Sequence, residues 1–141
     1  MLRLASASPR RKALLEAAGV DLQVCAAECD ERVLAEEDTL TYVRRLARDK
    51  LLAARAKAAD NAGETWLAAD TVVWFAPQGA PMVKPLDDED ARRMVQTLTA
   101  GTPHEVTTAW ALARGGGEPE VRHETTRVWM RPLTVTELDA Y

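Results

Sequence analysis

Basic residues stand at the start of a predicted helix near the N-terminus, where their charge is unfavourable. Ser8 suits the N-cap and Pro9 the first helical position. A capping box would place Glu or Gln at position 11, but the sequence has Arg11, flanked by Arg10 and Lys12. Cations at the positive end of a helix dipole cost a few tenths of a kcal/mol each, whereas a bound phosphate would reverse that cost. The segment is therefore either a solvated basic turn or an anion site.

A carboxylate interrupts the most apolar strand that the sequence predicts, residues 66–75. Strand alternation places Asp70 on the same face as Trp66 and Trp74. A carboxylate on that face costs several kcal/mol unless it is paired, solvated or bound to a metal. We favour a functional Asp70 over an aspartate that only hydrogen-bonds to neighbouring backbone at a strand end.

Lys50 presents the same problem on a predicted helix, residues 39–59. Helical periodicity places it on one arc with Leu40, Val43 and Ala47, so it points inward among apolar side chains. The alternative is that Lys50 snorkels to the rim of the sheet. Its ammonium group would then still lie near a sheet edge, where α/β proteins bind ligands.

Two further features are weak when taken alone. Asp30 and Glu31 follow a predicted strand and could hold a hard cation such as Mg²⁺, although acidic pairs in loops are usually only solvated. Lys84 precedes Pro85 after a short predicted strand, which fixes a lysine beside a rigid bend.

Together these charged residues form a set: Arg10, Arg11, Lys50, Lys84, Glu31 and Asp70. Lysines and arginines neutralise phosphates, and carboxylates hold a divalent ion that lowers the pKa of a water molecule. The set is typical of phosphoanhydride hydrolysis by water, and we expect it to converge on one cleft at the sheet edge, with Asp70 and Lys50 on the same face. No Ser–His or Cys–His nucleophile is evident, and we interpret His104 and His123 as structural.

The elements that must position these residues alternate between strands and helices before a final hairpin. The predicted strands are residues 2–5, 22–26, 66–75 and 82–83, and two predicted helices are residues 9–18 and 39–59. A third helix is capped by Asp87 or Asp88 and carries its apolar residues at positions 91, 94, 95 and 98. Residues 105–113 and 121–131 are the strands of a hairpin whose tip is the glycine run at residues 115–117. A turn is expected at residues 77–79, and Leu14, Leu15 and Ala18 should form the apolar face of the first helix. The pattern predicts an α/β protein with a mixed twisted sheet and flanking helices, as a single domain over residues 1–141.

Composition excludes several classes of protein. A net charge of −4 argues against nucleic-acid binding, and no apolar run reaches the roughly 20 residues of a membrane span. Arg3 interrupts the N-terminus too early for a signal peptide. Cys25 and Cys29 make a poor zinc pattern and are interpreted as thiols in a reducing compartment. We expect a cytoplasmic protein with no nucleic-acid or membrane partner.

Five segments occur in the order seen in Maf-type nucleoside triphosphate pyrophosphatases. They are residues 6–11 (SASPRR), 42–50 (YVRRLARDK), 69–73 (ADTVV), 84–85 (KP) and 104–109 (HEVTTA). The resemblance covers essentially the whole chain. It implies a fold like that of Maf and inosine-triphosphatase proteins and a divalent metal, Mg²⁺ or Mn²⁺. It also implies hydrolysis of a nucleoside triphosphate between the α and β phosphates, and Asp70–Thr71 with Arg10 resembles the branch acting on dTTP and UTP.

The resemblance also implies a role for each site residue. Asp70 would be the proton acceptor that activates water and, with Glu31, a metal ligand. Substrate contacts are implied for Ser6, Ser8, Arg10, Arg11, Lys50, Thr71 and Lys84. The implied partner is a nucleoside triphosphate, and a homodimer is a possible assembly.

Family members continue past the position of Tyr141, with a glutamine that helps to read the base, so we expect a domain that lacks its C-terminal part. The capping box formed by Thr134 and Glu137 opens only a short helix, and an exposed apolar strip on the sheet is expected. The alternative function is a non-catalytic nucleotide-binding or septum-formation regulatory protein that is inactive for this reason. A haloacid-dehalogenase-type phosphatase is excluded, because it needs Asp-x-Asp where this chain has Ala68 and Val72 on either side of Asp70.

Overall fold

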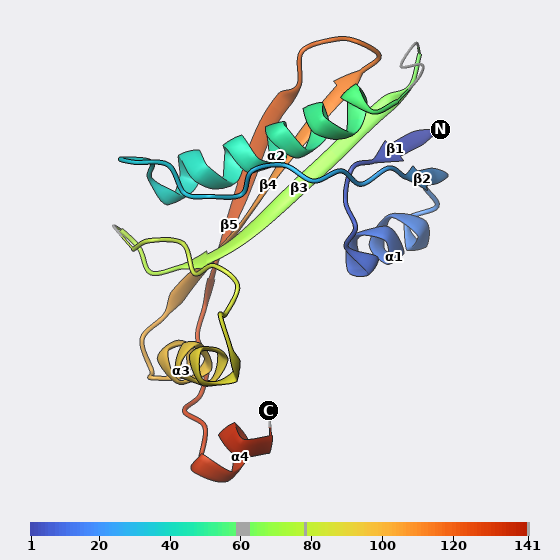
Figure 1. Ribbon diagram of the computed structural model, residues 1–141. Helices are drawn as coiled ribbons and strands as arrows, with labels where there is room; N and C mark the ends of the chain where they lie inside the picture. Colours follow the sequence, from blue (N-terminus) through green and yellow to red (C-terminus); the bar gives the residue numbers. More distant parts are fainter. Residues whose placement is uncertain (59–62, 78, 141) are drawn as a thin grey trace.

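A mixed five-stranded sheet forms the centre of the computed structural model, which describes residues 1–58, 63–77 and 79–140. The strands lie in the order β2-β1-β3-β4-β5 (Figure 1). Their bounds are β1 (Leu2–Leu4), β2 (Leu22–Val24), β3 (Thr65–Trp74), β4 (His104–Arg114) and β5 (Glu120–Val128). The first three strands are parallel, and β4 and β5 are antiparallel to their neighbours. The predicted α/β class with a mixed sheet is confirmed.

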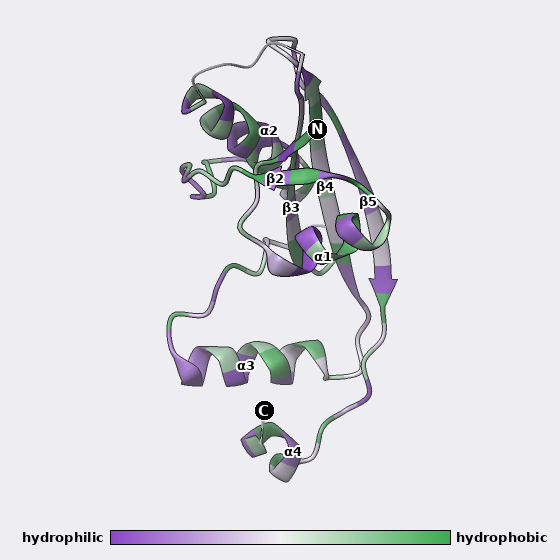
Figure 2. Ribbon diagram, turned by 90° about the vertical axis from the view of Figure 1, so that its right-hand side faces the viewer, coloured by the Kyte–Doolittle hydropathy of each residue, from purple (hydrophilic) through white to green (hydrophobic). Residues whose placement is uncertain are grey.

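The helices are α1 (Pro9–Ala17), α2 (Thr39–Ala56), α3 (Asp88–Leu98) and α4 (Val135–Ala140). Helix α2 runs along one face of the sheet, whereas α3 and α4 lie beyond one end of it (Figure 1, Figure 2). None of the helices formed by the described residues has the length and apolarity needed to cross a membrane.

Packing of α2 on β3 and β4 forms the core. Asp38 caps this helix by accepting a hydrogen bond of 2.8 Å from the Thr41 backbone N–H group. One stripe of α2, including Val43, Leu46 and Leu51, is buried against the strands. Each such side chain contributes about 1.5–3 kcal/mol on burial, so α2 is firmly held on this face.

The same helix is fastened to the hairpin by arginines that the sequence places on its polar side. Arg48 pairs with Glu118 at 3.3 Å, and Arg55 donates to the Gly117 carbonyl at 2.7 Å, at the predicted glycine-rich tip. Arg44 contacts the His123 ring at 3.2 Å, which agrees with a structural role for this histidine.

Strand β3 is longer than its neighbour β1, and the excess length creates a free strand edge. The register pairs Leu2–Leu4 only with residues 65–67 of β3, and Ala5 N–H adds one bond to the Leu67 carbonyl. Beyond that point, the carbonyl of Ala69 accepts from the Arg11 side chain and that of Val73 from Met82 N–H. Asp70 therefore lies where β3 is paired on one side only.

Several expectations need correction at the periphery. The expected apolar face of α1 is not buried: Leu14 is 71% exposed, and no residue of this helix is buried. Met82 forms one isolated bridge with Val73 instead of a strand at residues 82–83. Helix α2 ends at Ala56, and residue 59 and position 78 of the predicted turn lie outside the described residues.

Other local signals are confirmed. Asp87 caps α3 by accepting from Asp90 N–H at 2.8 Å. Thr134 and Glu137 form the capping box, with Thr134 N–H donating to the glutamate carboxylate at 2.9 Å. Exposed apolar side chains include Leu112 on β4 and, after the end of β5, Trp129 and Met130.

Candidate active site

Lys50 on α2 joins two carboxylates from different parts of the chain. Its Nζ atom donates to Asp70 Oδ1 at 2.5 Å and to Glu31 Oε1 at 2.9 Å. The Lys50 and Asp70 side chains are 17% and 14% exposed, and Glu31 is 46% exposed. Lys50 and Asp70 lie on the same face of the sheet, as their two periodicities predicted.

Lys50, Asp70 and Glu31 form a triad in which one ammonium group pairs with two carboxylates. Burial lowers the pKa of Lys50, but the hydrogen bonds to Asp70 and Glu31 outweigh that effect and leave the pKa above its ordinary value. The hydrogen bond from Lys50 holds the pKa of Glu31 below its ordinary value. At neutral pH the ammonium group and the Glu31 carboxylate are therefore both charged.

The position of the ammonium group also indicates where a divalent cation could bind. The Lys50 ammonium group is itself a cation, and it contacts one oxygen of Asp70 and one oxygen of Glu31. Among residues 1–58, 63–77 and 79–140, no three His, Cys, Asp or Glu side chains gather as a metal site. Two carboxylates suit Mg²⁺ or Mn²⁺ when phosphate oxygens and water complete the coordination. The donor set therefore fits a metal that arrives with a phosphate ligand.

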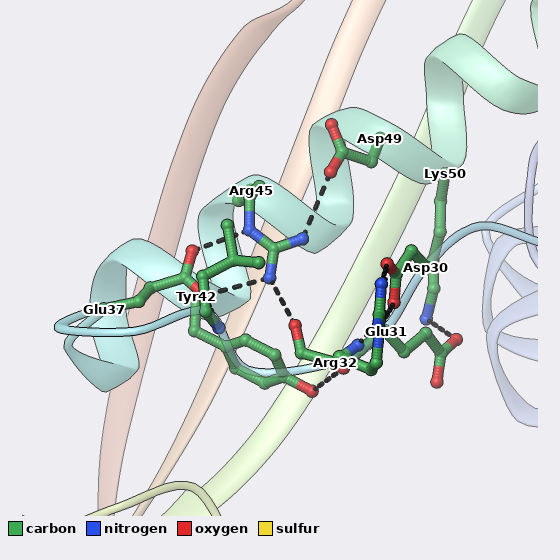
Figure 3. A network of polar contacts seen from close by, with 9 residues as sticks. Asp30, Glu31, Arg32, Glu37, Tyr42, Arg45, Asp49 and Lys50 are labelled. Atoms are coloured by element: carbon green, nitrogen blue, oxygen red, sulfur yellow. Dashed lines mark hydrogen bonds and ion pairs between the residues drawn. The ribbon is translucent and has the colours of Figure 1, made fainter.

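The loop that carries Glu31 is held against α2 by side chains that are not among the predicted site residues (Figure 3). Tyr42 Oη donates to the Glu31 carbonyl at 2.9 Å, and Arg45 donates to the Arg32 carbonyl at 2.9 Å. Arg45 also pairs with Glu37 at 2.6 Å. Tyr42 and Arg45 are three residues apart, which places them on one side of the helix. This spacing is visible in the sequence and is the signal that could have identified the pair.

Arg45→Gln is expected to lower the free energy of unfolding by about 1–3 kcal/mol, because Glu37 is only 5% exposed and would lose its charged partner. Urea denaturation measures the change. Arg48→Gln is the matched control on the same helix. Its partner Glu118 is 88% exposed, so the expected loss is only about 0–1 kcal/mol.

The pH dependence of this loss gives a second readout. The hydrogen bond from Arg45 holds the pKa of Glu37 below its ordinary value of 4.5. Such a carboxyl group stabilises the fold above pH 4.5, and the contribution disappears as the pH falls through the lowered folded-state pKa. The wild-type advantage over Arg45→Gln should therefore shrink below pH 4.5. Equal losses in the two arginine variants, or a pH-independent difference, would contradict this account of the loop.

A second group of polar side chains surrounds the start of α1. Ser6 Oγ accepts from Ser8 N–H at 3.3 Å and from Arg11 Nη1 at 3.2 Å. The other guanidinium nitrogen, Nη2, donates to Thr71 Oγ1 at 3.0 Å. Ser8 is the N-cap residue, but its side chain makes no capping hydrogen bond. The Arg11 side chain therefore joins the loop after β1 to the free edge of β3.

The two groups line one cleft with two lobes. The larger lobe, about 930 Å³, contains Ser6, Ser8 and Arg11, and the smaller, about 330 Å³, contains Asp70 and Thr71. Glu31, Lys50 and Lys84 line both lobes and so form the waist between them.

Most of the predicted site residues therefore meet at this cleft. Arg10 is the exception, because it is exposed and lines neither lobe. The cleft also includes Lys57, Cys29 and Tyr42, which no charge anomaly in the sequence singled out. Burial raises the pKa of the Cys29 thiol, which keeps it protonated and unreactive at neutral pH.

The arrangement suits the attack of water on a bound phosphate group. Cations at the waist and around Arg11 can neutralise phosphate groups, and the first backbone N–H groups of α1 add to that field. The Asp70 carboxylate can accept a proton from a water molecule held at the waist.

Two solved structures share the fold of this chain. A likeness with a TM-score of 0.60 relates 91% of this chain to 70% of the structure of the Staphylococcus aureus Ham1 protein, at 16% identity. A HAM1 protein from Coxiella burnetii gives a TM-score of 0.54 at 14% identity, over 91% of this chain and 71% of that one. The chain has the fold of the Ham1 proteins.

Sequence comparison then identifies the family. The model described as Maf-like protein matches residues 1–141. A "dTTP/UTP pyrophosphatase" of Geobacter sulfurreducens is 41% identical over 139 residues, which are 98% of this chain and 70% of that protein. A protein of the same name from Halalkalibacterium halodurans is 41% identical over 140 residues, or 99% and 70% of the two chains. The chain belongs to the Maf family, which confirms the predicted resemblance.

Proposed function

We propose that residues 1–141 form one pyrophosphatase domain that hydrolyses dTTP and UTP to the nucleoside monophosphate and pyrophosphate. The observation that carries the proposal is the triad at the waist of the cleft, where Lys50 lies within 2.9 Å of Glu31 and 2.5 Å of Asp70. The names of relatives about 40% identical supply the substrate class.

Asp70 acts as the proton acceptor. Its carboxylate lies on the free-edged part of β3, in the smaller lobe and in contact with Lys50 at the waist, so it can reach a water molecule beside a phosphate there. Glu31 and Asp70 would hold a Mg²⁺ or Mn²⁺ ion. Such an ion neutralises phosphate oxygens and lowers the pKa of an attacking water molecule.

The remaining residues bind and orient the nucleotide. Lys50 and Lys84 at the waist neutralise the phosphates on both sides of the bond that breaks. Ser6, Ser8 and Arg11 bind phosphate oxygens in the larger lobe, and Thr71 contacts the substrate in the smaller one. We assign no contact to Arg10, because it lines neither lobe.

Incubation of the purified protein with dTTP, UTP or dATP, each with Mg²⁺ or Mn²⁺, tests the proposal. Monophosphate plus pyrophosphate, formed faster from dTTP and UTP than from dATP, is the expected result, and the metal series identifies the better ion. Diphosphate plus orthophosphate would overturn cleavage between the α and β phosphates. Binding without turnover would favour the alternative of a non-catalytic nucleotide-binding protein.

We include a homodimer in the proposal, as the family implies. Exposed apolar side chains such as Leu112 and Trp129 provide surface that a second copy could cover. Light scattering of the purified protein across a concentration series tests this part separately from the activity.

A further inference from the structure

Thr108 is a residue outside the proposed catalytic set that contacts it through one hydrogen bond. It lies on β4 directly opposite Thr71 of β3, and the two Oγ1 atoms are 2.9 Å apart. Asp70 faces α2, so strand alternation places Thr71 and its partner on the other face of the sheet. Thr108 is therefore separated from Lys50 and Asp70 by the sheet itself.

The hydrogen bond to Thr108 continues into the cleft. Thr71 Oγ1 accepts from Arg11 Nη2 at 3.0 Å, and Arg11 Nη1 donates to Ser6 Oγ at 3.2 Å and to the Ala69 carbonyl at 2.9 Å. A continuous set of hydrogen bonds therefore runs from β4 through β3 to the loop before α1. The guanidinium group in the middle of this set lines the larger lobe.

The Thr71 hydroxyl has two neighbours in this set, and its χ1 angle decides whether it meets both. Beyond Leu67, β1 no longer pairs with β3, so the cross-strand residue that can restrain Thr71 comes from β4. A hydroxyl group carries one proton and can accept two hydrogen bonds. Thr71 can therefore accept from Arg11 and still exchange a hydrogen bond with Thr108, while both side chains keep one rotamer.

We propose that Thr108 is a positioning residue for the nucleotide cleft. Its hydroxyl holds Thr71 in the rotamer that receives Arg11, and so fixes the guanidinium group before a phosphate binds. The effect on nucleotide affinity rests on the proposed function, whereas the effect on the Thr71 rotamer does not.

Thr108→Val keeps the shape of the side chain and removes the hydroxyl, and Thr108→Ser keeps the hydroxyl. The probe is α,β-imido-UTP with Mg²⁺, titrated by calorimetry, and UTP turnover is measured in parallel. Loss of one neutral hydrogen bond should raise Kd and KM about three- to tenfold in Thr108→Val, with a smaller change in kcat. Thr108→Ser should bind like the wild type.

Thr125→Val is the matched control. It removes a hydroxyl from a second cross-strand pair, Thr107–Thr125, with Oγ1 atoms 2.9 Å apart on the α2 side of the same hairpin. This control should leave Kd and KM unchanged, and thermal melting of each variant separates a loss of stability from a loss of affinity. In a Thr71→Val background, Thr108→Val should cause no further change in Kd, because Thr108 acts through Thr71.

The ¹³Cγ2 chemical shift of Thr71 reports its χ1 angle without any ligand. The expected result is a shift change in Thr108→Val but not in Thr108→Ser or Thr125→Val. An unchanged shift in Thr108→Val, or equal and additive Kd effects in the wild-type and Thr71→Val backgrounds, would overturn the proposal. A changed shift in a protein that neither binds nor cleaves the nucleotide would instead remove the proposed function and leave the positioning role standing.

Discussion

Replacement of Asp70 by Asn is expected to lower kcat by about 10²–10⁴-fold while the fold stays intact. An amide oxygen can still accept the hydrogen bond that Lys50 now donates at 2.5 Å, so the packing of α2 on β3 is preserved. The amide cannot accept a proton from water and carries no charge toward a metal ion. Product formation from dTTP and a urea melt of the same sample measure the two halves of the prediction.

Asp30→Asn is the control for this substitution. Asp30 is next to Glu31 in the chain, but its carboxylate pairs with Arg32 at 2.6 Å, and the Asp30 side chain is 54% exposed. Its replacement should leave kcat within about twofold, as is usual for an exposed surface pair. Near-normal turnover in Asp70→Asn would move the role of proton acceptor to Glu31.

Replacement of Lys50 by Met is expected to have two opposite effects. Loss of a cation that stabilises charge on the phosphates should reduce kcat by about 10²–10³-fold. The same change removes the ammonium group that now occupies the point between Asp70 and Glu31. Two carboxylates without a counter-charge attract a divalent ion, so the free variant should bind Mn²⁺ more tightly than the free wild type.

Calorimetric titration with Mn²⁺ alone, without nucleotide, measures the second effect. Lys12→Met provides the comparison, because Lys12 is half exposed and pairs with Glu16 at 3.6 Å, outside the cleft. Its affinity for Mn²⁺ should match that of the wild type. Equal Mn²⁺ affinity in Lys50→Met and the wild type would show that the lysine does not compete with a metal ion for these carboxylates.

The residues that the sequence could identify were those whose charge conflicts with their local pattern. Asp70 interrupts an apolar strand and Lys50 an apolar helix face, and both conflicts are resolved by the ion pair that joins them. The helix caps Asp87 and Thr134 were equally readable, because capping depends on neighbours only a few residues away. The alternation of strands and helices before a final hairpin was also visible in the sequence, and it predicted the mixed sheet.

What could not be predicted depends on distances between elements. Arg10 and Arg11 look alike in the sequence, but adjacent helix positions point in different directions, and only Arg11 reaches the sheet. Which of the two does so follows from the placement of α1 relative to β3. The apolar residues of α1 show the same limit, because an amphipathic pattern does not say whether a neighbouring element covers it.

The greater length of β3 over β1 has a consequence for how the protein behaves in a concentrated solution. A strand edge with unpaired carbonyl and N–H groups is a template for pairing with another chain. Here the Arg11 side chain and Met82 N–H occupy the carbonyls of Ala69 and Val73 along that edge. A charged guanidinium group in this position also repels an approaching strand that would have to bury it. Arg11, which is proposed to bind phosphate, therefore also disfavours intermolecular β-sheet formation at this edge.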